Sequence, residues 1–153
     1  MQQADEVVAA LRRRGETVCT VESLTGGLLC AALTDAPGAS ELVHGGIVAY
    51  TIDAKHDVVG VDEHVLAEYG AVSAQTAQAL AVRAREVFGS TWAVATTGVA
   101  GPATQEGKPV GTVFVAVDGP ASDVAQLALS GDRHQIRTKS CAQALELLLS
   151  LME

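Results

Sequence analysis

Residues 18–33, VCTVESLTGGLLCAAL, place a β-branched run directly before a glycine pair and an apolar segment. The pattern predicts a strand over 17–22 and a helix over 25–33 that opens at Gly26-Gly27. A helix start carries unpaired backbone N–H groups and about half a positive charge, which suits a phosphate or an oxyanion. Ser23 lies at the bend between the two elements, and we predict the functional site there.

Two roles for Ser23 remain open from these residues. Helix capping is the ordinary role of a serine at such a bend. Capping does not explain Gly26 and Gly27, because each glycine in a first helical turn costs about 1 kcal/mol relative to alanine. Their benefit is bare backbone that a ligand can approach closely, which favours a role in binding or catalysis.

The composition is typical of one α/β domain over residues 1–153. The chain is 48% hydrophobic but only 3% aromatic, so valine, leucine and alanine must build the core. The net charge of −8 argues against nucleic-acid binding, which needs a basic face. We expect no membrane association and a cytoplasmic location, because no signal peptide and no apolar run of about 18 residues is present.

The three cysteines, Cys19, Cys30 and Cys141, contain no CxxC spacing, so we expect neither a zinc site nor a redox dithiol. Buried, reduced thiols are the plain interpretation.

Strand-like and helix-like segments alternate along the rest of the chain. Strands are expected at 17–22, 45–50, 92–97, 110–118 and 124–129, helices at 4–14, 25–33, 73–88 and 132–152, and short helices or turns at 51–60 and 62–68. The polar connection 103–108 is expected to be mobile. The last turns, 145–152, are apolar almost all round, which indicates burial and, in so small a domain, a subunit interface.

Lys55 is the candidate base for a serine nucleophile, because no histidine stands in a suitable pattern. It follows Tyr50 by five residues, just past an apolar strand. Desolvation that lowered its pKa from about 10.4 toward 7–8 would fit it for this role, at about 4 kcal/mol. Tyr50 would relay a proton or hold the ligand. A solvated lysine and a packed tyrosine explain the same spacing.

Two further patterns suit an anionic ligand. The glycine-rich loop 97–102 follows a strand, at the edge where α/β sheets bind ligands. Arg133 and Arg137 lie one helical turn apart, and phosphate is a natural anion for two guanidinium groups. Pairing with Asp132 is the alternative for these arginines. The basic run 12–14 is interpreted as a helix end.

Six blocks, taken together and in order, resemble the C-terminal domain family of the competence/damage-inducible protein CinA. The blocks are VESLTGGLL (21–29), GGIVAYTIDAK (45–55), GAVSAQTAQALA (70–81), ATTGVAGP (95–102), KPVGTVFVAV (108–117) and GDRHQIR (131–137). The chain departs from the family at Leu24, where relatives often have cysteine, and at 103–108, where ATQEGK replaces a glycine-rich run.

The resemblance implies a three-layer α/β/α domain with a mixed sheet of about five strands. It also implies hydrolysis of the carboxamide of nicotinamide mononucleotide, giving nicotinate mononucleotide and ammonia in pyridine-nucleotide salvage, without a metal or other cofactor. Ser23 and Lys55 fall on the family's serine–lysine arrangement, and Tyr50 on its tyrosine. The substrate-binding residues implied are Thr25, Gly26, Gly27, Gly46, Thr97, Gly98, Ala100, Gly101, Arg133 and Arg137.

In this interpretation the N–H groups near Gly26 and Gly27 stabilise the tetrahedral oxyanion, and the arginines hold the 5′-phosphate. The expected partners are the small-molecule substrate and other copies of the chain in a homo-oligomer. Two alternatives remain: a non-catalytic nucleotide-binding or regulatory module, and an interaction protein of DNA uptake or repair. The charge of −8 argues against direct DNA contact.

Overall fold

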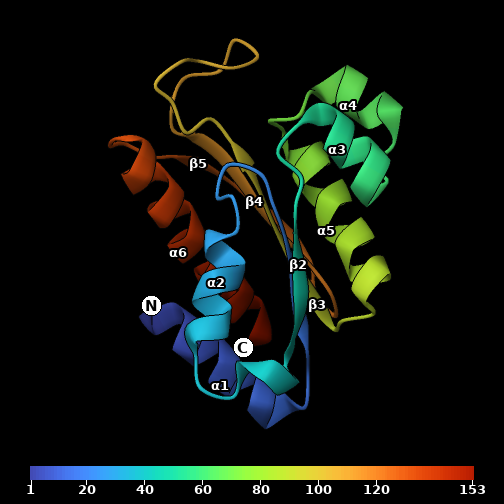
Figure 1. Ribbon diagram of the computed structural model, residues 1–153, viewed down its shortest axis with the longest axis vertical. Helices are drawn as coiled ribbons and strands as arrows, with labels where there is room; N and C mark the ends of the chain where they lie inside the picture. The colour runs from blue at the N-terminus through green and yellow to red at the C-terminus, as the bar shows by residue number, and fades with distance from the viewer.

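The computed structural model describes residues 1–153 and contains one five-stranded mixed sheet with the order β2-β1-β3-β4-β5 (Figure 1). The strands are β1 (Val18–Glu22), β2 (Val43–Val48), β3 (Trp92–Gly98), β4 (Thr112–Asp118) and β5 (Asp123–Ala128). Strands β1, β2 and β3 are parallel, whereas β4 runs antiparallel to both of its neighbours. The predicted α/β class with a mixed sheet of five strands is confirmed.

Six α-helices cover the two faces of this sheet (Figure 1). One face carries α1 (Gln2–Arg14), α2 (Leu28–Asp35) and α6 (Arg133–Met152), and the other carries α3 (Ile52–Ala54), α4 (Glu63–Tyr69) and α5 (Ala74–Phe88). A 3₁₀ turn at Ala39–Glu41 precedes β2, and one turn of π-helix at Lys55–Val59 continues α3. None of these helices has the length and apolar character needed to cross a membrane.

The central strands supply side chains to two hydrophobic cores, one on each face. On β3, Trp92 and Val94 belong to the core under α1, α2 and α6, whereas Ala93 and Ala95 belong to the core under α5. This division follows from the alternation of side chains along a strand. It also explains why all five residues of β1 are buried, as expected of a strand covered on both faces.

Two predicted boundaries near the site differ from the structure. Helix α2 begins at Leu28 rather than at residue 25, because Gly26 and Gly27 have φ angles of 58° and 103°, which a right-handed helix excludes. Strand β2 ends at Val48 rather than at Tyr50, which therefore lies in the loop that follows.

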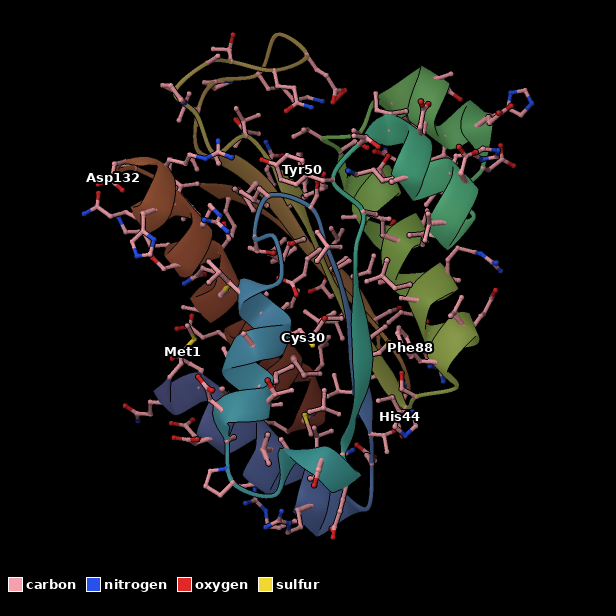
Figure 2. All side chains as sticks on the ribbon, in the orientation of Figure 1. Met1, Cys30, His44, Tyr50, Phe88 and Asp132 are labelled. Atoms are coloured by element: carbon pink, nitrogen blue, oxygen red, sulfur yellow. The ribbon has the colours of Figure 1, made fainter.

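The predicted helix starts at Ser73 and Asp132 are confirmed, since each side chain accepts a hydrogen bond from a backbone N–H of its helix. The expectation of three buried thiols holds for Cys19 and Cys141, while Cys30 is only half-buried. Figure 2 shows Cys30 between α2 and the sheet.

Candidate active site

The carboxyl ends of the three parallel strands meet at one edge of the sheet, where such folds bind ligands. Ser23 directly follows β1, Ala49 follows β2, and the glycine-rich loop begins at Gly98, the last residue of β3. A cavity of about 290 Å³ opens there. Figure 2 shows Tyr50 at this end of the molecule, beneath the long loop that follows β3. The strand ends thus bring distant segments to one hollow.

Ser23 and Lys55 are in direct contact in this cavity. Lys55 Nζ lies 2.8 Å from Ser23 Oγ and donates to the carbonyl oxygen of Ala49 at 2.7 Å. Both side chains line the cavity, and only 1% of Lys55 and 8% of Ser23 are exposed. A neutral Lys55 amine could keep its bond to Ala49 and accept the hydroxyl proton of Ser23 on its lone pair. The pair therefore has the geometry of a nucleophile and its base.

Burial lowers the pKa of Lys55 from 10.5 to about 8, because the cavity wall cannot solvate an ammonium ion as water does. The nearby Glu106 carboxylate opposes this change in the pKa. The two hydrogen-bond acceptors of Lys55 are neutral oxygens rather than carboxylates. About a tenth of the lysine is consequently neutral at pH 7, and about half at pH 8.

The local sequence explains the position of Lys55. Thr51 caps α3 by accepting a hydrogen bond from the backbone N–H of Ala54, and the π-helical turn begins at Lys55 itself. A π-helical turn is rare and is frequent at functional sites. The turn ends at Gly60, whose φ of 89° is left-handed. This short segment points the lysine side chain back beneath the end of β2.

The start of α2 is already occupied by a side chain of the protein. The Glu22 carboxylate, 1% exposed, accepts hydrogen bonds from the N–H groups of Gly27, Leu29 and Cys30 at 2.9–3.2 Å. The Thr25 hydroxyl donates to the same carboxylate at 2.7 Å. A carboxylate is the natural partner of a helix N-terminus, so Glu22 satisfies the donors that we expected a ligand to use.

The expectation that the N–H groups of Gly26 and Gly27 face an oxyanion is therefore not met. The Gly26 N–H donates to the Ser23 carbonyl, and the Gly27 N–H donates to Glu22. The backbone N–H of Leu24, by contrast, donates to no group of the protein. Leu24 lines the cavity and directly follows Ser23. In strand-to-helix serine sites the residue after the serine is a usual oxyanion donor.

Arg133 and Arg137 have different surroundings although they lie one turn apart on α6. The exposed Arg133 lines the cavity and donates to the Tyr50 hydroxyl at 2.6 Å and to the Gly101 carbonyl at 2.5 Å. Arg137 lies outside the cavity lining, where it donates to the carbonyls of Leu24 at 2.9 Å and Thr25 at 3.1 Å. Arg133 therefore faces the cavity, and Arg137 holds the turn that carries Ser23.

The structure brings most of the sequence-predicted residues to the cavity but leaves some outside its lining. Those at the cavity are Ser23, Tyr50, Lys55, Thr97, Gly98, Ala100, Gly101 and Arg133. Those outside its lining are Thr25, Gly26, Gly27, Gly46 and Arg137. Gly46 instead lies within β2, where a Cβ atom would come within 2.4 Å of the Thr20 hydroxyl oxygen. Close packing of two strands explains this glycine.

Sequence reasoning missed part of the cavity lining. Ala71, Val72 and the segment 102–105 line the cavity, and the Thr97 hydroxyl donates to the Ala71 carbonyl at 2.7 Å. The block GAVSAQTAQALA was quoted for the resemblance, but Ala71 and Val72 within it were given no role in the site. No cluster of three or more side chains suited to a metal ion exists in the chain. The chemistry available at the cavity is that of a serine, a lysine, a tyrosine and an arginine.

Comparison with known proteins places the chain in a family. The model of the CinA C-terminal domain matches residues 1–152. CinA-like proteins of Frankia casuarinae and Anaeromyxobacter dehalogenans are 47% and 48% identical to it, over 95% and 94% of the chain. The match covers 34% and 36% of those two proteins, so the chain spans about a third of the length of these curated relatives.

Solved structures agree with this assignment. The competence/damage-inducible protein CihA of Agrobacterium tumefaciens is 37% identical and superposes with a TM-score of 0.95, covering 99% of this chain and 94% of that one. A CinA superfamily protein of Escherichia coli is 30% identical with a TM-score of 0.94, covering 97% of this chain and 88% of that one. The fold and the site are those of a compact α/β domain with a serine at a strand end. The chain belongs to the CinA C-terminal domain family.

Proposed function

We propose that the protein is a nicotinamide-nucleotide amidohydrolase, which converts nicotinamide mononucleotide to nicotinate mononucleotide and ammonia. The observation that carries this proposal is the 2.8 Å contact between Ser23 Oγ and the buried Lys55 Nζ in a ligand-sized cavity. The resemblance of the whole chain to a family with nicotinamide mononucleotide deamidases supplies the substrate.

In the first step Ser23 Oγ attacks the carbonyl carbon of the carboxamide while neutral Lys55 accepts the hydroxyl proton. The carbonyl π electrons move to oxygen and form a tetrahedral oxyanion. The free N–H of Leu24 is the donor best placed in sequence to stabilise this charge, and Arg137 fixes the peptide plane that follows it. Removal of one such donor typically costs about 10²–10³ in rate.

In the second step the C–N bond breaks and the Lys55 ammonium returns its proton to the leaving nitrogen, which departs as ammonia. Water then attacks the acyl-enzyme ester, Lys55 accepts a proton from that water, and Ser23 leaves with the proton restored. A lysine with a pKa of about 8 can both accept a proton from Ser23 and donate it to the leaving nitrogen near neutral pH. The products are the carboxylate and the free serine.

The substrate phosphate would bind at Arg133, the exposed guanidinium at the cavity mouth. Its bonds to Tyr50 and Gly101 hold it in place and leave the remaining N–H groups for the ligand. Such a local cation explains how a chain with a net charge of −8 would bind an anion.

The decisive experiment compares Ser23→Ala with wild-type protein in an assay of ammonia release from nicotinamide mononucleotide. We expect the variant to lose at least about 10³-fold in kcat while its Tm stays within a few degrees. Ser40→Ala is the matched control, because Ser40 is exposed and precedes β2 at the end of the strand away from the site. It should retain full activity.

Full ammonia release by Ser23→Ala would contradict the proposal. A thermal shift on addition of the nucleotide to wild-type protein, with no ammonia released, would also contradict it and would favour the non-catalytic nucleotide-binding module.

A further inference from the structure

The segment 103–108, expected to be mobile, ends in a small hairpin that contacts the body of the protein. Gln105 and Lys108 form an antiparallel bridge, with their backbone N–H···O distances at 3.3 and 2.8 Å. The two residues between them, Glu106 and Gly107, have φ angles of 54° and 71°. Positive φ at both central residues is the pattern of a type I′ hairpin turn.

This turn directs Glu106 onto the backbone of Ala71 and Val72. Its two carboxylate oxygens accept hydrogen bonds from the N–H groups of Ala71 at 3.0 Å and Val72 at 2.9 Å. Lys108 Nζ from the same hairpin donates to the Val72 carbonyl. The hairpin therefore contacts the backbone of Ala71 and Val72, and these two residues line the cavity.

Ala71 and Val72 are buried, so the hydrogen bonds from Glu106 to their N–H groups contribute to the stability of this segment. Ala71 and Val72 are 3% and 1% exposed, and buried backbone N–H groups need partners. Nothing else in the protein accepts hydrogen bonds from these two N–H groups. Release of Glu106 would leave both donors without a protein partner.

Two further features fit a hairpin held in one place. Glu106 adopts a left-handed backbone that is unfavourable for a residue with a side chain, so its carboxylate contacts must outweigh a cost of about 1 kcal/mol. Gly70 has no side chain, and a Cβ atom there would lie 1.9 Å from Glu106 Oε2. The glycine leaves the space that the carboxylate occupies.

We propose that residues 103–108 form a strap over the active-site cavity, and that Glu106 latches it to the backbone of Ala71 and Val72. This inference rests on the proposed function, because its role is to hold the nicotinamide nucleotide. Thr104 and Gln105, which directly precede Glu106 on this strap, line the cavity. Glu106 is thus a positioning residue: it closes the cavity around the substrate without touching the reacting atoms.

The test uses Glu106→Gln and Glu106→Asp. The first keeps the side-chain length but replaces one acceptor oxygen with a donor, and the second keeps the carboxylate but shortens its reach. Glu68→Gln is the matched control, since it removes the same charge from an exposed position on α4. All three changes are at exposed residues, so the fold should be retained.

The first measurement is backbone amide exchange by nuclear magnetic resonance. We expect the Ala71 and Val72 amides to exchange at least about tenfold faster in both Glu106 variants than in wild type and Glu68→Gln. The amides within β3 should stay protected in all four proteins. Unchanged exchange at Ala71 and Val72 would overturn the latch, whether or not the protein is an enzyme.

The second measurement is the steady-state kinetics of ammonia release. We expect both Glu106 variants to raise KM for nicotinamide mononucleotide by about fivefold or more, with kcat changed by less than about threefold. Equal KM values in wild type and the Glu106 variants would overturn the role in substrate holding. Absence of ammonia release from wild-type protein would count against the proposed function alone, and the exchange measurement would still decide the latch.

Discussion

Lys55 is buried, and its ammonium group donates hydrogen bonds only to the Ser23 hydroxyl and the Ala49 carbonyl. This environment bears on the pH dependence of activity and on the free energy of unfolding. Its ammonium form is poorly solvated, and a lowered pKa of about 8 is the result. Only the neutral form can act as a base toward Ser23. We therefore expect Lys55 to make both the proposed activity and the stability of the protein depend on pH.

The first consequence is a pH dependence of activity. We expect kcat/KM for nicotinamide mononucleotide to rise about tenfold per pH unit below pH 8 and to level off above it, because the neutral fraction of Lys55 follows this course. Steady-state rates between pH 6 and pH 9.5 test this, with the Tm followed over the same range as a control for folding. A rate that does not change between pH 6 and pH 8 would contradict the role of Lys55 as base.

The second consequence is a stability cost. The difference between the pKa of 10.5 and the folded pKa of about 8 corresponds to about 3 kcal/mol at neutral pH. We expect Lys55→Met to abolish activity and to raise the free energy of unfolding by about 1–3 kcal/mol at pH 7, since lost hydrogen bonds offset part of the gain. Urea denaturation of both proteins measures the difference.

The sign of the pH effect provides an internal control. Between pH 8 and 10.5 the unfolded chain binds the Lys55 proton and the folded chain does not, so the Lys55 contribution to stability rises with pH through that window. The advantage of Lys55→Met should shrink accordingly. An advantage that is the same at pH 7 and pH 10 would mean that burial of the charge is not its cause.

At the scale of the elements, α6 contributes two arginines with separable roles. Arg133 donates to the rim of the cavity, whereas Arg137 donates to two carbonyls of the Ser23 turn. A charged hydrogen bond to a phosphate is worth about 1.5–3 kcal/mol. Loss of a cation at the rim should weaken substrate binding, and loss of support under the turn should slow the chemical step.

We therefore expect opposite kinetic signatures from two equivalent substitutions. Arg133→Met should raise KM about 10–100-fold with little change in kcat, and Arg137→Met should lower kcat about 10–100-fold with little change in KM. Each variant is the control for the other, because both remove one positive charge from α6. Equal effects of the two substitutions on KM would contradict this division.

Local sequence patterns predicted the helices better than they predicted the exact residues at which some of them begin. Strong periodicity and caps predicted α5 and α6 well, since Ser73 and Asp132 act within their own helices. The glycine pair was misinterpreted as the first turn of α2, although its positive φ angles form the bend before the helix. A glycine that opens a helix and one that precedes it look the same in the sequence.

At the scale of the whole molecule, the sheet order explains what sequence could and could not predict about the site. The glycine-rich loop after β3 was predicted to lie at the ligand edge of the sheet. The structure adds that the parallel strands β1, β2 and β3 bring Ser23 and Tyr50 to the same edge. The use of Glu22 against the start of α2 was not predicted. Neither was the contact of Glu106 with Ala71, which crosses 35 residues of chain. Such polar contacts join residues that only the folded chain brings together, so no periodic pattern in the sequence indicates them.

The apolar end of α6 was predicted to be buried, and the structure buries one side of it while Leu147, Leu149 and Leu151 are half-buried. Leu145, Leu148 and Met152 lie in the core that α6 shares with α1. Assembly into a homo-oligomer through this region remains a proposal, which sedimentation velocity of the purified chain can test.

Arg133 and Arg137 lie one turn apart on the same helix, α6. A rigid movement of this helix therefore moves both residues. A shift of α6 along its axis by a fraction of its 5.4 Å pitch would move both guanidinium groups in the same direction. It would change the Arg133 contact with Tyr50 and the Arg137 contact with the Ser23 turn together. The C-terminal end of α6 packs against α1, more than four helical turns from Arg137. We therefore expect a displacement of α6 at its contact with α1 to change substrate affinity and turnover together.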